Sequence, residues 1–341
     1  NSPLMQLCVY FNMVFIMIVG SKLVITSGGQ TIDVGQMSAM LTYGFQILMS
    51  LMMISMIYVM LTMSAESAKR ICEVLAEEPA LRNPENPLTE VKDGSVDFDG
   101  VSFKYAAKAK KFALRDIDLH IASGITVGIL GGTGSSKTTL IQLISRLYDT
   151  TEGSVRVGGV DVRDYDMETL RNSVAVVLQK NLLFSGTIKD NLRWGNPDAT
   201  DEELVAACKL AQADDFVRSF PDGYDTWIEQ GGTNVSGGQK QRLCIARALL
   251  KKPKVLILDD STSAVDTRTD ALIRAGFKTY IPETTKIIIA QRVASVQDAD
   301  MIIIMDNGRI AATGTHDELL RSSEIYREVC QQQANGGDDD E

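Results

Sequence analysis

The sequence predicts a mixed α/β domain that follows two membrane-spanning α-helices. Two observations point to this division. The first 65 residues contain only two charged side chains, Lys22 and Asp33. From about residue 96, short aliphatic runs alternate with stretches of helical periodicity, which is typical of an α/β domain.

Residues 4–26 and 37–63 are each apolar over a length that can cross a bilayer, which takes about 20 residues. A buried helix of a large soluble domain is the alternative. A signal peptide fits poorly, because no basic segment precedes the first run and a second apolar run follows. The basic pair Lys69–Arg70 favours a cytoplasmic C-terminal side. We therefore expect residues 1–80 to belong to a multi-pass plasma-membrane protein, with the second helix extending into the cytoplasm.

The chain begins at Asn1, inside an apolar run, so we expect it to be the C-terminal part of a longer polypeptide. Residues 81–95 are interrupted by prolines and predict a linker, and residues 96–331 predict the α/β domain. Continuous aliphatic runs predict parallel strands, whereas the alternating runs at 95–105 and 153–162 predict antiparallel strands. The continuous runs are 125–130, 173–178, 254–260, 285–290 and 300–306. Residues 332–341 end in GGDDDE and predict a disordered acidic tail.

Composition argues against several functional classes. The net charge of −10 disfavours non-specific nucleic-acid binding, so we expect no nucleic-acid partner. The five cysteines form no C-x-x-C pair, which indicates free thiols in a reducing cytosol. The two histidines, His120 and His316, are too few and too far apart for a histidine-based metal site.

The segment GGTGSSKTTL, residues 131–140, is close to the phosphate-binding pattern G-x-x-x-x-G-K-[ST]. It follows an aliphatic strand and precedes a helix, so backbone N–H groups and a helix N-terminus can hold an anion. Lys137 would reach the terminal phosphates of ATP and Thr138 would ligate Mg²⁺. Ser136 stands where the second glycine is expected, at a cost of about 1 kcal/mol. The residues predicted to hold the nucleotide here are Gly131, Gly132, Thr133, Gly134, Ser135, Ser136, Lys137, Thr138 and Thr139.

The run VLILDD, residues 255–260, is an aliphatic strand that ends in two carboxylates, the form of a Walker B element. Asp259 would orient Mg²⁺, and Asp260 would stand where a general base polarises the attacking water. The fold class predicted for residues 96–331 is therefore an α/β P-loop nucleotide-binding domain with a mixed sheet and an antiparallel β part.

The stretch NVSGGQKQRLCIARALL, residues 234–250, places a Ser-Gly-Gly-Gln turn before a helix, which is a second anion-binding helix start. Here the chain resembles the ATP-binding cassette (ABC) family over residues 96–330, and this stretch is similar to the family's signature. The resemblance implies that Ser236, Gly237, Gly238 and Gln239 act in catalysis, that Tyr105 stacks on adenine, and that Gln179 senses Mg²⁺ and contacts the membrane domain. It also implies a helical subdomain within the α/β domain, and it places Asp266 in the loop after Walker B, beside the nucleotide.

The resemblance extends to the two apolar helices, which look like the last two of six in a multidrug-type half-transporter. It implies a small-molecule transport substrate, a lipid bilayer and a second half-transporter as partners. Eleven of the 14 methionines lie in the first 63 residues, which favours either a cavity for varied lipophilic compounds or lipid-facing packing.

Three positions depart from the family pattern, and all three are on the Walker side. Ser136 replaces a glycine, Asp260 replaces a glutamate, and Gln291, in IIIAQR, replaces the switch histidine. A base drawn back by about 1 Å can cost on the order of 100-fold in rate. Glutamine can donate a hydrogen bond but cannot carry the charge of histidine.

Because the signature is intact while the Walker side is altered, the resemblance implies a heterodimer. In this reading the chain binds MgATP at its own Walker site but hydrolyses it poorly, and its signature completes the active site of its partner. Two alternatives stay open: a homodimeric exporter with slow hydrolysis, and a membrane-anchored regulatory ATP-binding module.

Overall fold

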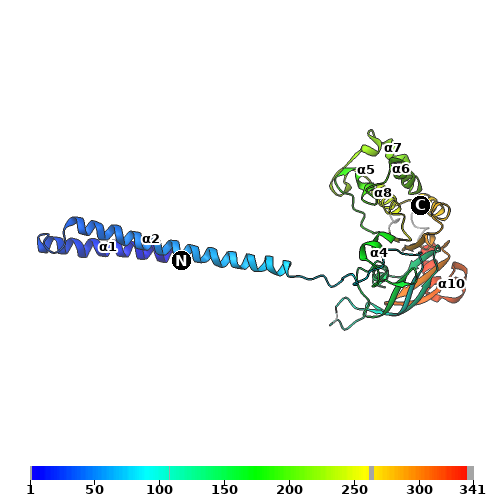
Figure 1. Ribbon diagram of the computed structural model, residues 1–341, viewed down its shortest axis with the longest axis horizontal. Helices are drawn as coiled ribbons and strands as arrows, with labels where there is room; N and C mark the ends of the chain where they lie inside the picture. The colour runs from blue at the N-terminus through cyan, green and yellow to red at the C-terminus, as the bar shows by residue number, and fades with distance from the viewer. Residues whose placement is uncertain (1, 107, 261–264, 336–341) are drawn as a thin grey trace. The chain divides into compact units, whose positions relative to one another are not determined.

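The structure is a computed structural model that describes residues 2–106, 108–260 and 265–335. The chain divides into two compact units, Asn1–Ala80 and Leu81–Glu341 (Figure 1). Each unit is described by itself below.

The first unit is a pair of helices, α1 (Ser2–Ser27) and α2 (Val34–Leu75), that pack against each other. The turn between them uses Gly28 and Gly29, both with positive φ. Asp33 begins α2 with a capping box, because its carboxylate accepts from the Gln36 amide and the Gln36 side chain accepts from the Asp33 amide. Both helices are long and apolar enough to span a membrane. Helix α1 is slightly longer than the predicted span 4–26, and α2 continues past the predicted span 37–63, as the sequence leads us to expect.

The second unit is built on a six-stranded sheet in the order β12-β11-β3-β10-β9-β6. Five strands are parallel, and β12 joins the edge antiparallel to β11. The strands are β3 (Thr126–Leu130), β6 (Val174–Val177), β9 (Val255–Asp259), β10 (Thr285–Ile289), β11 (Met301–Asp306) and β12 (Arg309–Gly314). The five aliphatic runs of the sequence are these five parallel strands, so the predicted fold class is confirmed.

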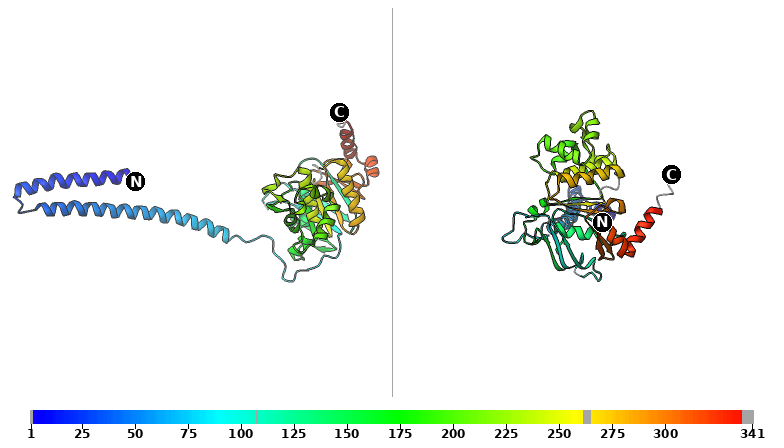
Figure 2. Two further views of the ribbon diagram at one scale, coloured as in Figure 1. Left: turned by 90° about the horizontal axis from the view of Figure 1, so that it is seen from above. Right: turned by 90° about the vertical axis from the view of Figure 1, so that its right-hand side faces the viewer.

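A four-stranded antiparallel sheet, in the order β2-β1-β4-β5, covers one face of the parallel sheet. Its strands are β1 (Val96–Phe103), β2 (Leu114–Ile121), β4 (Glu152–Val157) and β5 (Val160–Asp161), and a separate short ribbon pairs β7 (Gly186–Thr187) with β8 (Trp227–Ile228). Helices cover the other face, so that the parallel sheet lies between two layers (Figure 2).

The helices of this unit begin with α3 (Lys137–Ile144), which packs with the antiparallel sheet, and α4 (Met167–Ser173). The helical subdomain comprises α5 (Ile188–Arg193), α6 (Asp201–Leu210), α7 (Asp214–Ser219) and α8 (Gly237–Leu249). The remaining helices are α9 (Thr267–Tyr280), α10 (His316–Ser322) and α11 (Glu324–Asn335), with 3-10 turns η1 (Gly223–Asp225), η2 (Gln230–Gly232) and η3 (Val293–Ser295).

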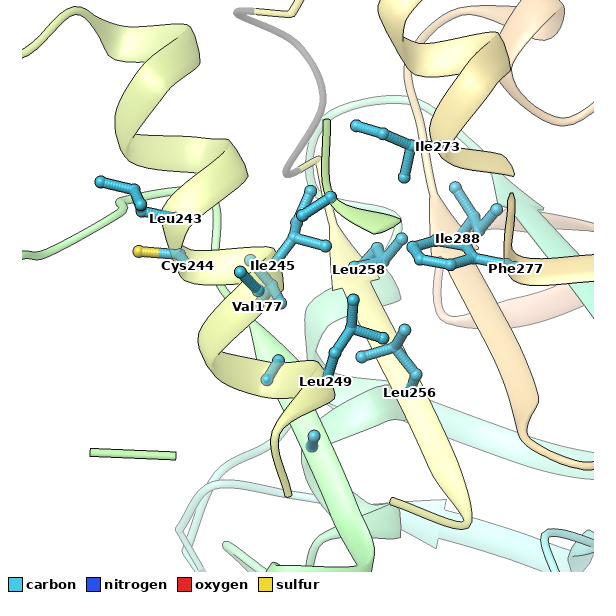
Figure 3. Packing of buried hydrophobic residues seen from close by; sticks show 14 of the residues in the cluster. Val177, Leu243, Cys244, Ile245, Leu249, Leu256, Leu258, Ile273, Phe277 and Ile288 are labelled. Atoms are coloured by element: carbon cyan, nitrogen blue, oxygen red, sulfur yellow. The ribbon is translucent and has the colours of Figure 1, made fainter. Parts of the chain in front are cut away.

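The alternation of side chains along the parallel strands explains why their sequences are apolar throughout. In β9, Val255 and Ile257 pack with the antiparallel sheet, whereas Leu256 and Leu258 pack under the helices. Figure 3 shows this second layer, where side chains of α8 and α9 meet those of β9 and β10. The sheet is therefore buried on both faces, which fixes the loops at its ends.

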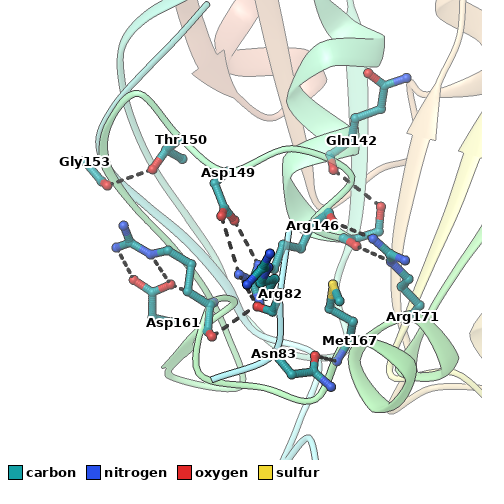
Figure 4. Close-up of polar contacts among 12 residues, drawn as sticks. Arg82, Asn83, Gln142, Arg146, Asp149, Thr150, Gly153, Asp161, Met167 and Arg171 are labelled. Carbon is teal, nitrogen blue, oxygen red and sulfur yellow. Dashed lines mark hydrogen bonds and ion pairs between the residues drawn. The ribbon is translucent and has the colours of Figure 1, made fainter. Parts of the chain in front are cut away.

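The segment predicted as a linker, residues 81–95, lies along the second unit. Arg146, which is 5% exposed, donates to the backbone carbonyls of Arg82 and Arg163 and pairs with Asp149 (Figure 4). Leu88 exchanges backbone hydrogen bonds with the stretch 164–166. These contacts fix the start of the domain upstream of β1.

The C-terminal boundary differs from the sequence prediction. Residues 332–335, predicted as part of the disordered tail, continue α11, and the Gln333 side chain bonds to the loop after β10. The acidic residues 336–341 lie outside the described residues.

Candidate nucleotide-binding site

Four neighbouring parallel strands bring the candidate site together. Strands β3, β10, β9 and β6 lie side by side and run in the same direction, so their carboxyl ends meet at one edge of the sheet. The loop of residues 131–136 follows β3, Asp260 follows β9, Gln291 follows β10 and Gln179 follows β6. This edge is where α/β sheets of this kind bind ligands.

The loop of residues 131–136 is shaped to receive an anion. Of residues 132–136, all of which the structure describes, only the Ser135 amide donates to a protein acceptor, the Gly132 carbonyl. A Cβ at Gly131 would collide with the Met305 carbonyl oxygen, so glycine is required there. The first N–H groups of α3 follow directly and also lack helical acceptors. The donors of this cradle therefore remain available for phosphate oxygens.

Ser136 adopts φ 72° and ψ 26°, in the left-handed region, and makes no side-chain capping bond to α3. A residue with a Cβ pays about 1 kcal/mol or more in this conformation, whereas glycine does not. The cost that the sequence predicts at this position thus has its origin in the backbone conformation.

Lys137 folds back over the loop. Its ammonium donates to the carbonyls of Gly131 (2.7 Å) and Gly132 (3.0 Å) and to the Ser135 hydroxyl (3.3 Å). Burial lowers the pKa of Lys137, and the negative charges of Asp259 and Asp260 oppose this shift. A polyphosphate in the cradle would further favour the charged form of the lysine.

Thr138 and Asp259 form the oxygen pair expected of a magnesium site. The Thr138 hydroxyl donates to Asp259 Oδ2 at 3.2 Å, and Asp259 is only 8% exposed. Burial raises the pKa of Asp259, and the neighbouring charge of Asp260 adds to this rise. A hydroxyl and a carboxylate are ligands that Mg²⁺ accepts, together with phosphate oxygens and water. The residues present thus fit the metal, which would neutralise charge on the phosphates.

Asp260, which follows β9, contacts the residues that follow β6 and β10. Its Oδ2 accepts from Gln179 Nε2 at 3.0 Å and from Gln291 Nε2 at 2.8 Å. Its backbone has φ 49°, and its amide donates to the Ile289 carbonyl. One carboxylate oxygen therefore holds both glutamine amides in place.

Tyr105 lies beside the first turn of α3. Its hydroxyl is hydrogen-bonded to Thr139 Oγ1 at 2.8 Å, and its ring makes edge contacts with Phe103 and Tyr148. The side chain is 55% exposed, so a ring face remains accessible to a base. Tyr148, which sequence reasoning missed, helps to fix this ring.

The signature residues form a capping box at the start of α8. The Ser236 hydroxyl accepts from the Gln239 amide at 3.2 Å, and the Gln239 side chain accepts from the Ser236 amide at 2.9 Å. Ser236 and Gly237 are exposed. Within the described residues, no hydrogen bond joins Ser236, Gly237, Gly238 or Gln239 to the loop of residues 131–136 or to Asp260.

Asp266 caps α9, with its carboxylate accepting from the Thr269 amide at 2.9 Å. This bond, together with the charge of Arg242, lowers the pKa of Asp266. The preceding positions 261–264 of the segment STSAVD lie outside the described residues, so its predicted contact with the nucleotide stays a prediction.

Residues 114–263 match the model of the family described as ABC transporter. The chain contains an ABC transporter ATP-binding domain. The predicted phosphate loop, Asp259, Asp260, Gln179 and Gln291 lie at the carboxyl edge of the sheet, and the predicted signature residues lie at the start of α8; their roles stay predictions.

Similar proteins agree with this ABC domain and with a membrane location. An uncharacterized ABC transporter ATP-binding protein of Mycobacterium bovis is 43% identical over 317 residues, which are 90% of this chain and 54% of that protein. A Bacillus subtilis protein provisionally named as a multidrug export ATP-binding/permease protein is 41% identical over 79% of this chain and 46% of its own length. The chain thus spans about half the length of the curated relatives it matches.

A solved structure of a bacterial Atm1-family ABC exporter with ATP bound superposes with a TM-score of 0.78. The two sequences are 32% identical, and the match covers 97% of this chain and 57% of the exporter chain. With the two apolar helices, these likenesses indicate a membrane protein whose ABC domain is cytoplasmic.

Proposed function

We propose that this chain is a subunit of an ATP-driven membrane exporter that acts with a second, different half-transporter. It binds MgATP on the loop of residues 131–139 with Asp259, hydrolyses it slowly, and supplies Ser236–Gln239 to the active site of the partner. The observation that carries the proposal is the contrast between an intact signature whose Ser236 and Gly237 are exposed at the start of α8 and a Walker edge in which two neutral glutamines contact Asp260.

The environment of Asp260 supports slow hydrolysis at the chain's own site. Two amides already donate to its Oδ2, so only Oδ1 remains to accept the proton of an attacking water. Gln291 is neutral and cannot offer the positive charge of a protonated histidine to a phosphate. Binding needs neither group, because the cradle, Lys137 and Thr138 supply the phosphate contacts.

An apolar groove beside Gln179 supports coupling to a membrane domain. A cavity of about 260 Å³ is lined by Leu178, Leu182, Phe184 and Trp194, among others, and these four side chains are largely exposed. A segment that docks there would move together with the Gln179 loop, which reaches Asp260. ATP binding could thus be transmitted to the transport pathway.

The first unit supports lipophilic compounds as the substrate class. A cavity of about 390 Å³ between α1 and α2 is lined mainly by methionines, namely Met5, Met52, Met56, Met60 and Met63. Flexible thioether side chains adapt to varied apolar ligands. The names of the multidrug-export relatives support the same class.

The test is ATP turnover by the full-length transporter with its partner. We expect Asp260→Asn to keep most of the activity, because the partner's Walker site performs most of the hydrolysis. Gly237→Asp should abolish most of it, because a carboxylate would repel phosphate at the partner's site. The reverse ranking would refute these roles.

The homodimeric alternative predicts a different result. If the full-length chain purified alone turns over ATP as fast as the complex does, the heterodimer proposal is wrong. If it binds MgATP but hydrolyses it much more slowly than the complex with the partner does, the proposal gains support.

A further inference from the structure

The last turns of α11 hold the loop that carries Gln291. The Gln333 side chain donates from Nε2 to the Gln291 carbonyl at 2.7 Å and accepts at Oε1 from the Val293 amide at 2.8 Å. One carboxamide therefore uses both of its functions on the two peptide groups that flank Arg292.

Other contacts hold the two ends of this loop, because the Ala290 amide donates to the Ile129 carbonyl and the Ser295 amide donates to the Arg292 carbonyl. Strand β10 ends at Ile289, and Val293 begins the short turn η3, so Gln291 and Arg292 lie outside the helices and strands. Two hydrogen bonds from one side chain fix both the position and the orientation of such a segment. The Gln291 side chain then extends from this fixed backbone to Asp260 Oδ2.

Helix α11 is itself anchored to the domain. Tyr326 is fully buried, and its hydroxyl is hydrogen-bonded to His316 Nδ1 at 2.6 Å. Val329 and Cys330 pack against the same core. Residues 326, 329, 330 and 333 recur at the spacing of one helix face, so Gln333 lies on the face that docks.

We propose that Gln333 is a positioning residue of the ABC site, which sets the reach of Gln291 towards Asp260 and towards the terminal phosphate of a bound nucleotide. Its described hydrogen bonds go to the backbone of Gln291 and Val293, so it acts through the loop that carries Gln291. We call the two hydrogen bonds from Gln333 to the Gln291 carbonyl and the Val293 amide the tether. The expected effect on hydrolysis rests on the proposed function, whereas the tether itself does not.

The first measurement is hydrogen exchange of residues 290–296 in the nucleotide-free, full-length transporter. Gln333→Ala should speed exchange there about five-fold, because the Val293 amide loses its acceptor. Gln332→Ala is the matched control and should leave exchange unchanged, since the Gln332 side chain makes no hydrogen bond to the loop of residues 290–296 within the part of the chain that the structure describes. Unchanged exchange in Gln333→Ala would overturn the tether.

The second measurement is single-turnover hydrolysis of ATP at this chain's own site, with the partner's site disabled. Gln333→Ala should lower the rate about five-fold with little change in nucleotide affinity, and Gln333→Glu should do the same because a carboxylate cannot donate to the Gln291 carbonyl. In a Gln291→Ala background the Gln333→Ala effect should vanish.

If Gln333→Ala lowers the rate equally in the wild-type and Gln291→Ala backgrounds, Gln333 acts only on stability, and the proposed positioning role is wrong. If the wild-type chain binds no MgATP, the proposed function fails, and the exchange measurement alone decides the tether.

Discussion

Ser136 illustrates how one residue can carry strain at a binding loop. Its φ of 72° is a conformation that glycine adopts freely, and its side chain makes no capping hydrogen bond to α3 that would compensate. The strain lies directly before Lys137, where the loop must keep its shape for phosphate to bind.

Ser136→Gly should therefore raise the midpoint of thermal unfolding of the nucleotide-free protein. The gain in free energy of unfolding should reach about 1 kcal/mol at most, because the added freedom of the unfolded glycine offsets part of the relieved strain. Ser135→Gly is the control and should lower the midpoint, since Ser135 is buried and its hydroxyl accepts from Lys137. A lower midpoint in Ser136→Gly would contradict this account.

Asp259 predicts a pH dependence of stability. Its pKa is raised above the ordinary 3.8, first by burial. Its contribution to stability is thus present below the ordinary value and is lost as the pH rises through the raised value. At pH 7 the ionised carboxylate destabilises the nucleotide-free domain. Asp259→Asn should raise the unfolding midpoint at pH 7, and the difference should disappear near pH 4 and below.

Asp266 gives the opposite sign and serves as the contrast. Its pKa is lowered by the hydrogen bond from the Thr269 amide, so its contribution is present at neutral pH and is lost as the pH falls below its ordinary value. Asp266→Asn should accordingly lower the midpoint at pH 7. Equal effects of the two variants at pH 7 would show that the carboxylates do not differ in this way.

At the scale of elements, the start of α8 combines a structural and a chemical role. The capping box of Ser236 and Gln239 satisfies amides at the helix N-terminus, while Ser236 and Gly237 remain exposed to a partner. Because the same hydroxyl can serve both roles, a simple deletion would confuse them.

Ser236→Asp separates the two roles. Aspartate caps a helix as well as serine does, so thermal stability should be unchanged, whereas its charge should repel phosphate and abolish most ATP turnover by the full transporter. Thr200→Ala, which breaks the similar capping box of α6, should do the reverse and cost about 1 kcal/mol of stability without loss of turnover. Normal turnover in Ser236→Asp would exclude phosphate contact at this helix start.

At the scale of the whole molecule, the buried core belongs to the second unit. All buried hydrophobic residues of the described chain lie between Val91 and Tyr326, and the segment from Arg82 to Leu88 is bonded to that unit. No described residue of α2 is buried. The helices of the first unit therefore need lipid or further protein to cover their apolar side chains. The second unit has a hydrophobic core of its own, which is what independent folding requires.

Residues 81–341, expressed alone, should therefore unfold cooperatively on heating and should bind MgATP. Circular dichroism would follow unfolding, and a fluorescent ATP analogue would report binding, with Lys137→Ala as the control that folds but does not bind. A fragment without a cooperative transition would show that the first unit is needed for the fold.

The sequence by itself determined the strands and motifs, because these are contiguous. Apolar runs such as 254–260 specify a strand buried on both faces, and GGTGSSKT specifies a phosphate loop through its own backbone and Lys137. The departures at Ser136, Asp260 and Gln291 are likewise visible without a structure.

Only the tertiary structure decided how distant residues meet. Gln179 is 81 positions from Asp260, Gln291 is 31 positions from Asp260, and Gln333 is 42 positions from Gln291, yet hydrogen bonds join each pair. The order of the parallel strands brings the first three to one edge, and the docking of α11 adds the fourth. Nothing local distinguishes Gln333 from Gln331 and Gln332, because its role is set by contacts through space and not by its neighbours in the chain.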